Sequence, residues 1–265
     1  MTELLHRELT GDIIGVYYDV YNATSRSYPE YIYERAMEYD LCTKHISCRS
    51  QVEYQVLYKS KLVGVHYLDL LVAEQVIVEL KVASDLTRLH TAQTLSYLKA
   101  TGLSVGLLCN FGSMAPQFER LYFNIHDRPH VNAPTTPRAD WPDDLLTPHL
   151  TGEVIGGLYE VHAILGPGFV HRVYANAVYH ELLLRGLEVI PCREYQVFYR
   201  GRPIGEIKFN HLRVQNDVMV FPVALSDINS LSISSLKAWM QAQGVPLAIV
   251  ANFSQETLDF MVLRV

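Results

Sequence analysis

The chain has 265 residues, enough for one large domain or two small ones. Hydrophobic residues make up 49% of it and charged residues 19%, a balance that supports a packed core and excludes an intrinsically disordered chain. The formal net charge of −6 argues against strong non-specific binding to nucleic acid but leaves room for a local basic groove.

We expect an intracellular location, cytoplasmic or nuclear, because the sequence shows no recognisable sorting signal and no disulfide-type or zinc-type cysteine pattern. No apolar run approaches the roughly 18–20 residues that a bilayer span requires, so no membrane association is expected. Residues Met1 to Glu8 lack the apolar core of a secretory signal. The cysteines contain no C-x-x-C pair and no zinc-type spacing, so we interpret them as reduced thiols.

The first half of the chain shows alternating helical and strand patterns. Residues Ile13, Ile14, Tyr17, Val20 and Tyr21 have helical spacing, and a second helix is predicted from Glu30 to about Lys44, after Pro29. Further on, the pattern predicts strands at 51–58, 62–72, 75–82 and 104–109, a helix at 86–101, and a short edge strand at 121–123. The resulting order, α-α-β-β-β-α-β, predicts an α/β fold with a mixed sheet flanked by helices.

The second half of the chain repeats the first. Leu9-Thr10-Gly11-Asp12-Ile13-Ile14-Gly15 recurs as Leu150-Thr151-Gly152-Glu153-Val154-Ile155-Gly156. In the same alignment, Glu53-Tyr54-Gln55-Val56 meets Glu194-Tyr195-Gln196-Val197. After one inserted residue, Asn110-Phe111 meets Asn252-Phe253. So many ordered matches indicate a tandem duplication, and the two copies could pack as a pseudo-dimer within the chain.

A proline-rich segment separates the copies. Residues 128–148 contain five prolines and few aliphatic residues, which predicts an extended linker because proline blocks both helix and ladder hydrogen bonds. We therefore predict a first domain at residues 1–127, a linker at 128–148 and a second domain at 149–265.

Polar residues interrupt the third predicted strand of the first copy. Within Val76-Ile77-Val78-Glu79-Leu80-Lys81-Val82, Glu79 and Lys81 share one face of an otherwise apolar strand. Taken alone, they indicate a strand-face ion pair or a solvated face. Asp69 lies near the end of the preceding strand, where it could approach Glu79, or could simply be a strand-end aspartate. Two facing carboxylates need a bridging cation, and oxygen ligands suit Mg²⁺ or Mn²⁺.

Neighbouring helices offer further polar candidates. Gln93 and Tyr97 lie four residues apart on the helix after the third strand and so share a face, although a surface glutamine and a core tyrosine would give the same pattern. Glu30 and Glu34 share a face of the second helix, where Glu30 would also interact favourably with the helix dipole.

These residues together resemble a known family. Asp69 followed by Glu79-x-Lys81 resembles the core motif of the PD-(D/E)XK nuclease superfamily, and Gln93-x-x-x-Tyr97 resembles the additional motif of its RecB-like branch. The whole copy is similar to the small GxxExxY proteins of that superfamily. Their name motif is only partly kept: Ser27 replaces the glycine before Glu30 and Tyr33, whereas the second copy keeps Gly168 and Tyr174 but replaces the glutamate with His171.

The resemblance implies a fold and a set of roles. It implies two tandem restriction-endonuclease-like domains of α-β-β-β-α-β order. Asp69 and Glu79 would bind Mg²⁺ or Mn²⁺, and Lys81 would orient the attacking water or stabilise charge at the phosphate. Glu30 would complete the metal or water shell, and Gln93 and Tyr97 would support the site and contact the substrate.

The second copy lacks this set of residues. Glu79 corresponds to Phe221 and Lys81 to Val223, while Asp69 falls at His211 or Asn210. Gln93 falls at Ser235 or Ser234, and Tyr97 at Trp239 or Ala238. Phe221-Pro222 also places a proline in the third strand, which predicts an edge strand or a bulge there.

Two functions therefore compete. The first is a metal-dependent nuclease acting on DNA or RNA through the first domain, with a structural or binding second domain. The second is an inactive nuclease-fold protein that serves as a structural or adaptor subunit, with protein partners in a larger assembly. The full residue set of copy one favours the first; the acidic charge, Ser27 and the losses in copy two favour the second.

Overall fold

A computed structural model describes residues 5–124 and 147–265. The chain divides into two compact units, one formed by Met1–Val56 with Val65–Pro129 and the other by Leu57–Gly64 with His130–Val265. We call them unit 1 and unit 2. The predicted linker at residues 128–148 lies outside the described residues, apart from its last two.

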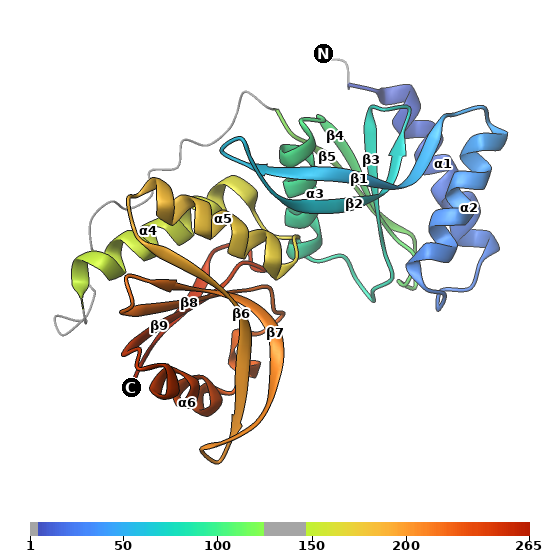
Figure 1. The fold of residues 1–265 in the computed structure, drawn as a ribbon. Helices are drawn as coiled ribbons and strands as arrows, with labels where there is room; N and C mark the ends of the chain where they lie inside the picture. Colours follow the sequence, from blue (N-terminus) through green and yellow to red (C-terminus); the bar gives the residue numbers. More distant parts are fainter. Residues whose placement is uncertain (1–4, 125–146) are drawn as a thin grey trace. The chain divides into compact units, whose positions relative to one another are not determined.

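Unit 1 is built around a five-stranded mixed sheet (Figure 1). Its elements are α1 (Arg7–Ala23), α2 (Glu30–Thr43), β1 (Cys48–Tyr58), β2 (Lys61–Val72), β3 (Val76–Lys81), α3 (Arg88–Thr101), β4 (Val105–Asn110) and β5 (Gln117–Tyr122). The end of the β1–β2 hairpin, Leu57–Gly64, is grouped with unit 2. The strands lie in the order β1-β2-β3-β4-β5, and β3 and β4 are parallel, whereas β2–β3 and β4–β5 are antiparallel. The parallel pair requires a crossover, which α3 provides.

Helices cover both faces of this sheet. On one face, α1 and α2 bury Ile13, Tyr17 and Met37 against the alternate residues Val76, Val78 and Leu80 of β3. On the other face, α3 packs so closely on β4 that a Cβ added to Gly106 would lie 3.3 Å from Leu98 Cδ1. The third strand is therefore central and covered on both sides, as its apolar sequence predicted.

Unit 2 has the same architecture. It comprises α4 (Pro148–Leu165), α5 (His171–Leu184), β6 (Val189–Tyr199), β7 (Arg202–Val214), β8 (Val218–Val223), the 3₁₀ turn η2 (Ile228–Ser230), α6 (Ile233–Gln243), β9 (Leu247–Asn252) and β10 (Asp259–Arg264). Its strand order is β10-β9-β8-β7-β6, with β8 and β9 parallel. The predicted fold class, two tandem α/β domains with mixed sheets and flanking helices, is confirmed.

Strand register fixes which residues of the two copies are equivalent. Leu70 pairs with Val78 in unit 1, and Leu212 pairs with Val220 in unit 2, so the alignment that matches Asn110 with Asn252 already holds at these strands. Asp69 therefore corresponds to His211 rather than to Asn210. The inserted residue lies earlier in β7, where pairing with β6 is irregular.

The prediction that Pro222 makes its strand an edge or a bulge is wrong. Strand β8 is central, and Pro222 pairs in regular parallel register with Ala251 of β9. The equivalent residue of unit 1 is Leu80, whose N–H donates to the Asp69 side chain. Pairing of β8 with β7 ends at Val220, so the N–H that proline lacks is not needed for that ladder.

No helix in the described ranges 5–124 and 147–265 combines the length and apolarity needed to cross a membrane.

Candidate active site

The third strand of unit 1 places a carboxylate and an ammonium side by side. Because Val76, Val78 and Leu80 face the α1–α2 core, Glu79 and Lys81 project from the opposite face of β3. Lys81 Nζ lies 2.7 Å from Glu79 Oε1, and the Glu79 residue is only 4% exposed. The simplest expectation for Glu-x-Lys, a strand-face ion pair, is therefore part of the arrangement.

Asp69 belongs to the same site. Its neighbour Leu70 points into the α1–α2 core, so Asp69 lies on the other face of β2. Asp69 Oδ2 accepts a hydrogen bond of 2.8 Å from the N–H of Leu80. The side chain thus takes up a backbone donor of β3 next to Glu79, and it leaves lone pairs of the carboxylate for another ligand.

The two carboxyl groups repel each other in a buried environment. Burial raises the pKa of Asp69 to about 6, and the nearby carboxylates of Glu30 and Glu34 act in the same direction. Burial raises the pKa of Glu79 to about 7, with a further contribution from Asp69. Raised values from desolvation and like charge are what a site built for a cation shows when no cation neutralises it.

Lys81 is held in its charged form. Burial lowers its pKa, but Glu79, Glu30 and Asp69 act against burial, and the net result is a raised pKa. Three carboxylates, Glu30, Asp69 and Glu79, thus face one ammonium, which leaves a formal charge of 1 − 3 = −2. A single divalent cation would balance this charge.

Glu30 lies at the start of α2 and reaches toward the sheet. Its Oε1 atom is 3.3 Å from the N–H of Val82, immediately after β3, so the first turn of α2 stands beside the end of that strand. Glu34, one turn further along α2, is buried and accepts a hydrogen bond from Gln51. Burial raises the pKa of Glu34.

On α3, Tyr97 is buried and Gln93 is partly exposed. The Tyr97 ring packs on His66 of β2, with ring centroids 4.4 Å apart. Burial, together with the charge of Lys81, lowers the pKa of His66 to about 4. Tyr97 therefore contacts His66, and His66 in turn lies near Lys81. No described contact places Gln93 at the carboxylates.

His66 was missed in the sequence. It precedes Asp69 by three residues, and in a regular strand this spacing would put the two side chains on opposite faces. The charge of Lys81 nevertheless acts on both His66 and Asp69, and alternation of residue types gave no signal for this.

The donor set fits a divalent oxygen-loving cation. Within the described part of the chain, no group of three or more histidine, cysteine, aspartate or glutamate residues is close enough to hold a metal ion. Mg²⁺, however, usually keeps several waters and binds proteins through only one or two carboxylates. Asp69 and Glu79 supply two such carboxylates, and burial raises the pKa of both, with repulsion from Asp69 adding to the shift at Glu79.

The equivalent face of unit 2 is apolar and aromatic. Phe221 and Val223 replace Glu79 and Lys81 and belong to a buried cluster with α6 residues. The ring of His211 stacks on Phe221 at 5.0 Å between centroids, at the position of Asp69. No carboxylate stands at any of these positions, so unit 2 cannot form the same site.

Comparison with known proteins gives one family match. A family model described as the PD-(D/E)XK nuclease superfamily matches residues 7–121 and again residues 148–265. Both units are thus matched separately, in agreement with the internal repeat. No curated protein and no solved structure matches the chain significantly.

Proposed function

The chain belongs to the PD-(D/E)XK nuclease superfamily, and on this premise we propose that unit 1 is a metal-dependent phosphodiesterase that acts on nucleic acid. The observation that carries the proposal is the buried group of Asp69, Glu79 and Lys81, in which the carboxylates remain undercompensated. A merely structural ion pair would need Glu79 and Lys81 but not a second buried carboxylate beside them.

We assign each side chain a role on this basis. Asp69 and Glu79 hold Mg²⁺ or Mn²⁺, which when bound neutralises the phosphodiester and lowers the pKa of water. Lys81, kept charged by Glu79, stabilises negative charge on the phosphate or orients the attacking water. Glu30 accepts a hydrogen bond from the backbone at the end of β3 and keeps a second oxygen for the water or metal shell.

Gln93 and Tyr97 are assigned supporting roles. Tyr97 packs on His66 and so closes the side of the site that faces α3. Gln93 lies one turn before Tyr97 on the same helix and is accessible to a substrate. These roles follow from the resemblance of the sequence to the RecB-like branch and the GxxExxY proteins.

Unit 2 supports a second candidate function for the protein. Its apolar replacement of the site suits a structural or binding unit, and the chain as a whole could then act as an inactive adaptor with protein partners. The buried carboxylates of unit 1 favour retained catalysis, because an adaptor would gain stability by losing them.

Cleavage assays on the full chain distinguish these functions. Labelled single- and double-stranded DNA and RNA are incubated with the protein and Mg²⁺ or Mn²⁺, beside the double variant Glu79→Ala, Lys81→Ala. Removing both partners avoids leaving one buried charge unpaired, so the variant is expected to fold. Cleavage that requires the metal and disappears in the variant supports the proposal.

A matched control removes a different ion pair of unit 1. Arg49 and Glu74 form an exposed pair with a 2.7 Å separation, and both side chains are more than half exposed. The variant Arg49→Ala, Glu74→Ala should cleave like the wild type. Absence of cleavage by the wild type on every substrate, together with absence of calorimetric metal binding, would contradict the nuclease and favour the adaptor.

A further inference from the structure

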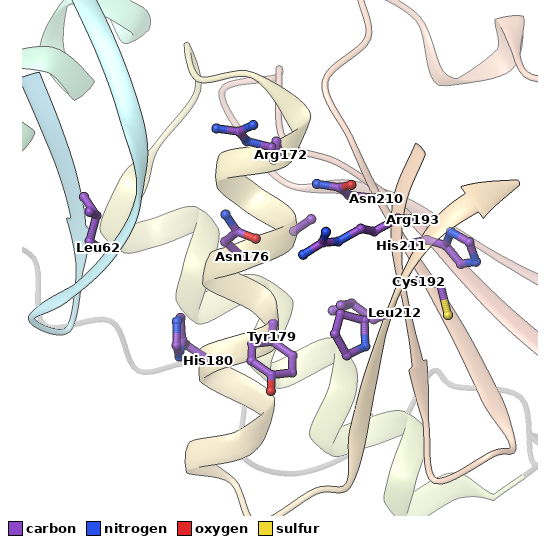
Figure 2. A pocket seen from close by; sticks show the side chains of 12 residues that line it. Leu62, Arg172, Asn176, Tyr179, His180, Cys192, Arg193, Asn210, His211 and Leu212 are labelled. Atoms are coloured by element: carbon purple, nitrogen blue, oxygen red, sulfur yellow. The ribbon is translucent and has the colours of Figure 1, made fainter. Parts of the chain in front are cut away.

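A second pocket lies in unit 2, on the face of its sheet opposite the aromatic cluster. It has a volume of about 590 Å³ and is bounded by α5, by strands β6 and β7, and by Leu62 of the Leu57–Gly64 segment that belongs to unit 2. Its polar lining consists mainly of Arg172, Asn176, Tyr179, His180, Arg193 and Asn210. Figure 2 shows Arg193 extending from β6 toward α5, whereas the ring of His211 lies on the far side of its strand.

The two arginines of this pocket are not neutralised by the protein. Among the described residues, neither Arg172 nor Arg193 has a carboxylate within ion-pair distance. By contrast, Arg185, which follows the last residue of α5, is paired with both Glu153 and Glu181. Unit 2 thus pairs the arginine that supports its helices and leaves the pocket arginines available to a ligand.

The equivalent positions of unit 1 carry carboxylates instead. There α2 supplies Glu34 and Glu38, which accept hydrogen bonds from Gln51 and Ser50 of the adjoining strand β1. In the alignment of the repeat that matches Tyr33 with Tyr174, Glu34 becomes Ala175 and Glu38 becomes Tyr179.

The same alignment shows where unit 2 gains positive charge. Tyr31 of α2 becomes Arg172, and Val52 of β1 becomes Arg193. The scaffold around the groove is unchanged, because Tyr33 and Tyr174 make the same hydrogen bonds in the two units. Because Arg35 of α2 becomes Asn176, unit 2 loses two carboxylates and one guanidinium group here and gains two guanidinium groups, a net change of +2 + 2 − 1 = +3 on one conserved frame.

We infer that this unit 2 pocket binds a phosphate group, and that phosphodiesters of a nucleic-acid strand are its source. Guanidinium groups match phosphate geometry and bind it through two parallel hydrogen bonds. Asn210 adds an amide, and Asn176 keeps one of its two amide N–H groups, because the other donates to the Val63 carbonyl at 2.7 Å. Arg172 lies in the first turn of α5, where the helix dipole also favours an anion. The inference rests on the proposed function only in the choice of nucleic acid as the source.

Such a pocket reconciles an acidic protein with a nucleic-acid substrate. The net charge of −6 disfavours broad electrostatic attraction. A local pair of unpaired arginines would still hold one or two phosphates of a strand. Unit 2 would then be a substrate-binding unit, although it has lost the catalytic carboxylates.

Binding measurements on the full chain in EDTA test the inference without cleavage. Labelled oligonucleotides are titrated by fluorescence anisotropy, and inorganic phosphate is titrated separately while the thermal transition of unit 2 is followed by Trp239 fluorescence. The variant Arg172→Ala, Arg193→Ala should bind oligonucleotide at least about tenfold more weakly, because each arginine loses a charge-assisted hydrogen bond. Its salt dependence should fall by about 1.4 to 1.8 in log–log slope for two lost phosphate contacts.

Two further variants make the result specific. Arg200→Ala, Lys237→Ala removes the same charge from exposed positions of unit 2 outside the pocket, and should bind like the wild type. Arg49→Ala, Glu74→Ala removes an exposed ion pair of unit 1 and should also bind like the wild type. Because EDTA removes the metal that cleavage requires, failure of the proposed activity and failure of this inference give different results.

Each outcome either supports the pocket as a nucleic-acid site or overturns it. Weakened oligonucleotide binding in the arginine variant alone supports a nucleic-acid site. Stabilisation of wild-type unit 2 by phosphate, with the oligonucleotide affinity unchanged in every variant, assigns the pocket to a small phosphorylated ligand. If the arginine variant and the exposed control behave alike toward both ligands, the inference is wrong. The Arg172→Lys, Arg193→Lys variant keeps the charge and guards against loss of binding through misfolding.

Discussion

Replacing Asp69 with asparagine should stabilise the metal-free protein at neutral and alkaline pH. Asparagine has nearly the same shape, and its side-chain oxygen can still accept the hydrogen bond from the Leu80 N–H. The substitution removes only the charge that the buried site cannot compensate in the absence of a cation. A residue whose loss stabilises the protein is characteristic of function rather than of folding.

The expected size follows from the pKa of Asp69. Its pKa rises from 3.8 to about 6 in the folded protein, and this difference corresponds to about 3 kcal/mol. Because the folded value lies above the unfolded one, the wild type loses this stability as pH rises from about 4 through 6. Residual solvent contact reduces the effect, so we expect a gain of about 2 kcal/mol for Asp69→Asn at pH 8 and almost none at pH 4.

Unfolding should be followed by far-ultraviolet circular dichroism in EDTA at both pH values. In a Trp141→Phe background, Trp239 of unit 2 is the only remaining tryptophan, so its fluorescence reports unit 2 separately and serves as an internal reference. The exposed substitution Asp217→Asn is the matched control and should leave stability unchanged at either pH.

Addition of Mg²⁺ completes the test. The wild type should gain stability with the metal, because a ligand that binds only the folded state shifts the equilibrium by mass action. The Asp69→Asn variant should gain much less. A variant that is destabilised at pH 8 as strongly as at pH 4 would show that the charge of Asp69 does not weaken the metal-free fold, and would refute the electrostatic reasoning.

Three further outcomes are expected. Affinity for Mg²⁺, measured by calorimetry, should weaken as pH falls through about 7 and about 6, because Glu79 and Asp69 must lose their protons to bind a metal. Tyr33→Phe and Tyr174→Phe should each lower the free energy of unfolding by about 1 kcal/mol in denaturant titrations, because each loses the hydroxyl that joins the helix to the preceding loop. Asn252→Ala should cost about 2–4 kcal/mol in thermal unfolding of unit 2, since its buried side chain bonds three backbone groups.

The sequence predicted the fold well because the fold depends on local patterns and on repetition. Helices and strands followed apolar spacing, and the internal repeat showed that the same topology occurs twice. The strand carrying Glu79 was correctly predicted as central from its apolar residues alone. The prediction that Pro222 marks an edge strand or a bulge was wrong. The cost of a missing N–H depends on where pairing with the neighbouring strand ends, and the sequence does not show that.

The candidate site could be predicted only in part. Glu79 and Lys81 lie two residues apart on one strand, so their proximity follows from strand geometry. The approach of Glu30 to the end of β3 depends on how α2 packs and had no sequence signal beyond resemblance. The basic pocket of unit 2 was equally hidden, because Arg172 and Arg193 belong to different elements and meet only through the packing of α5 on the sheet.

Comparison of the two units distinguishes residues that both folds require from residues that only the candidate site of unit 1 requires. Asn110 and Asn252 bond equivalent backbone groups: each accepts from an N–H at 3.0 Å and donates to a carbonyl at 2.9 Å, so this asparagine serves the fold. The hydrogen bond from the Leu80 N–H to the Asp69 carboxylate has no equivalent in unit 2. There Pro222 occupies the position of the donor and His211 the position of the acceptor. Both partners of one hydrogen bond have changed, which leaves no buried group unsatisfied. Unit 2 has therefore been rebuilt around the loss of the carboxylate, and a single substitution of His211 by aspartate would not recover the site, because the N–H that oriented it is gone.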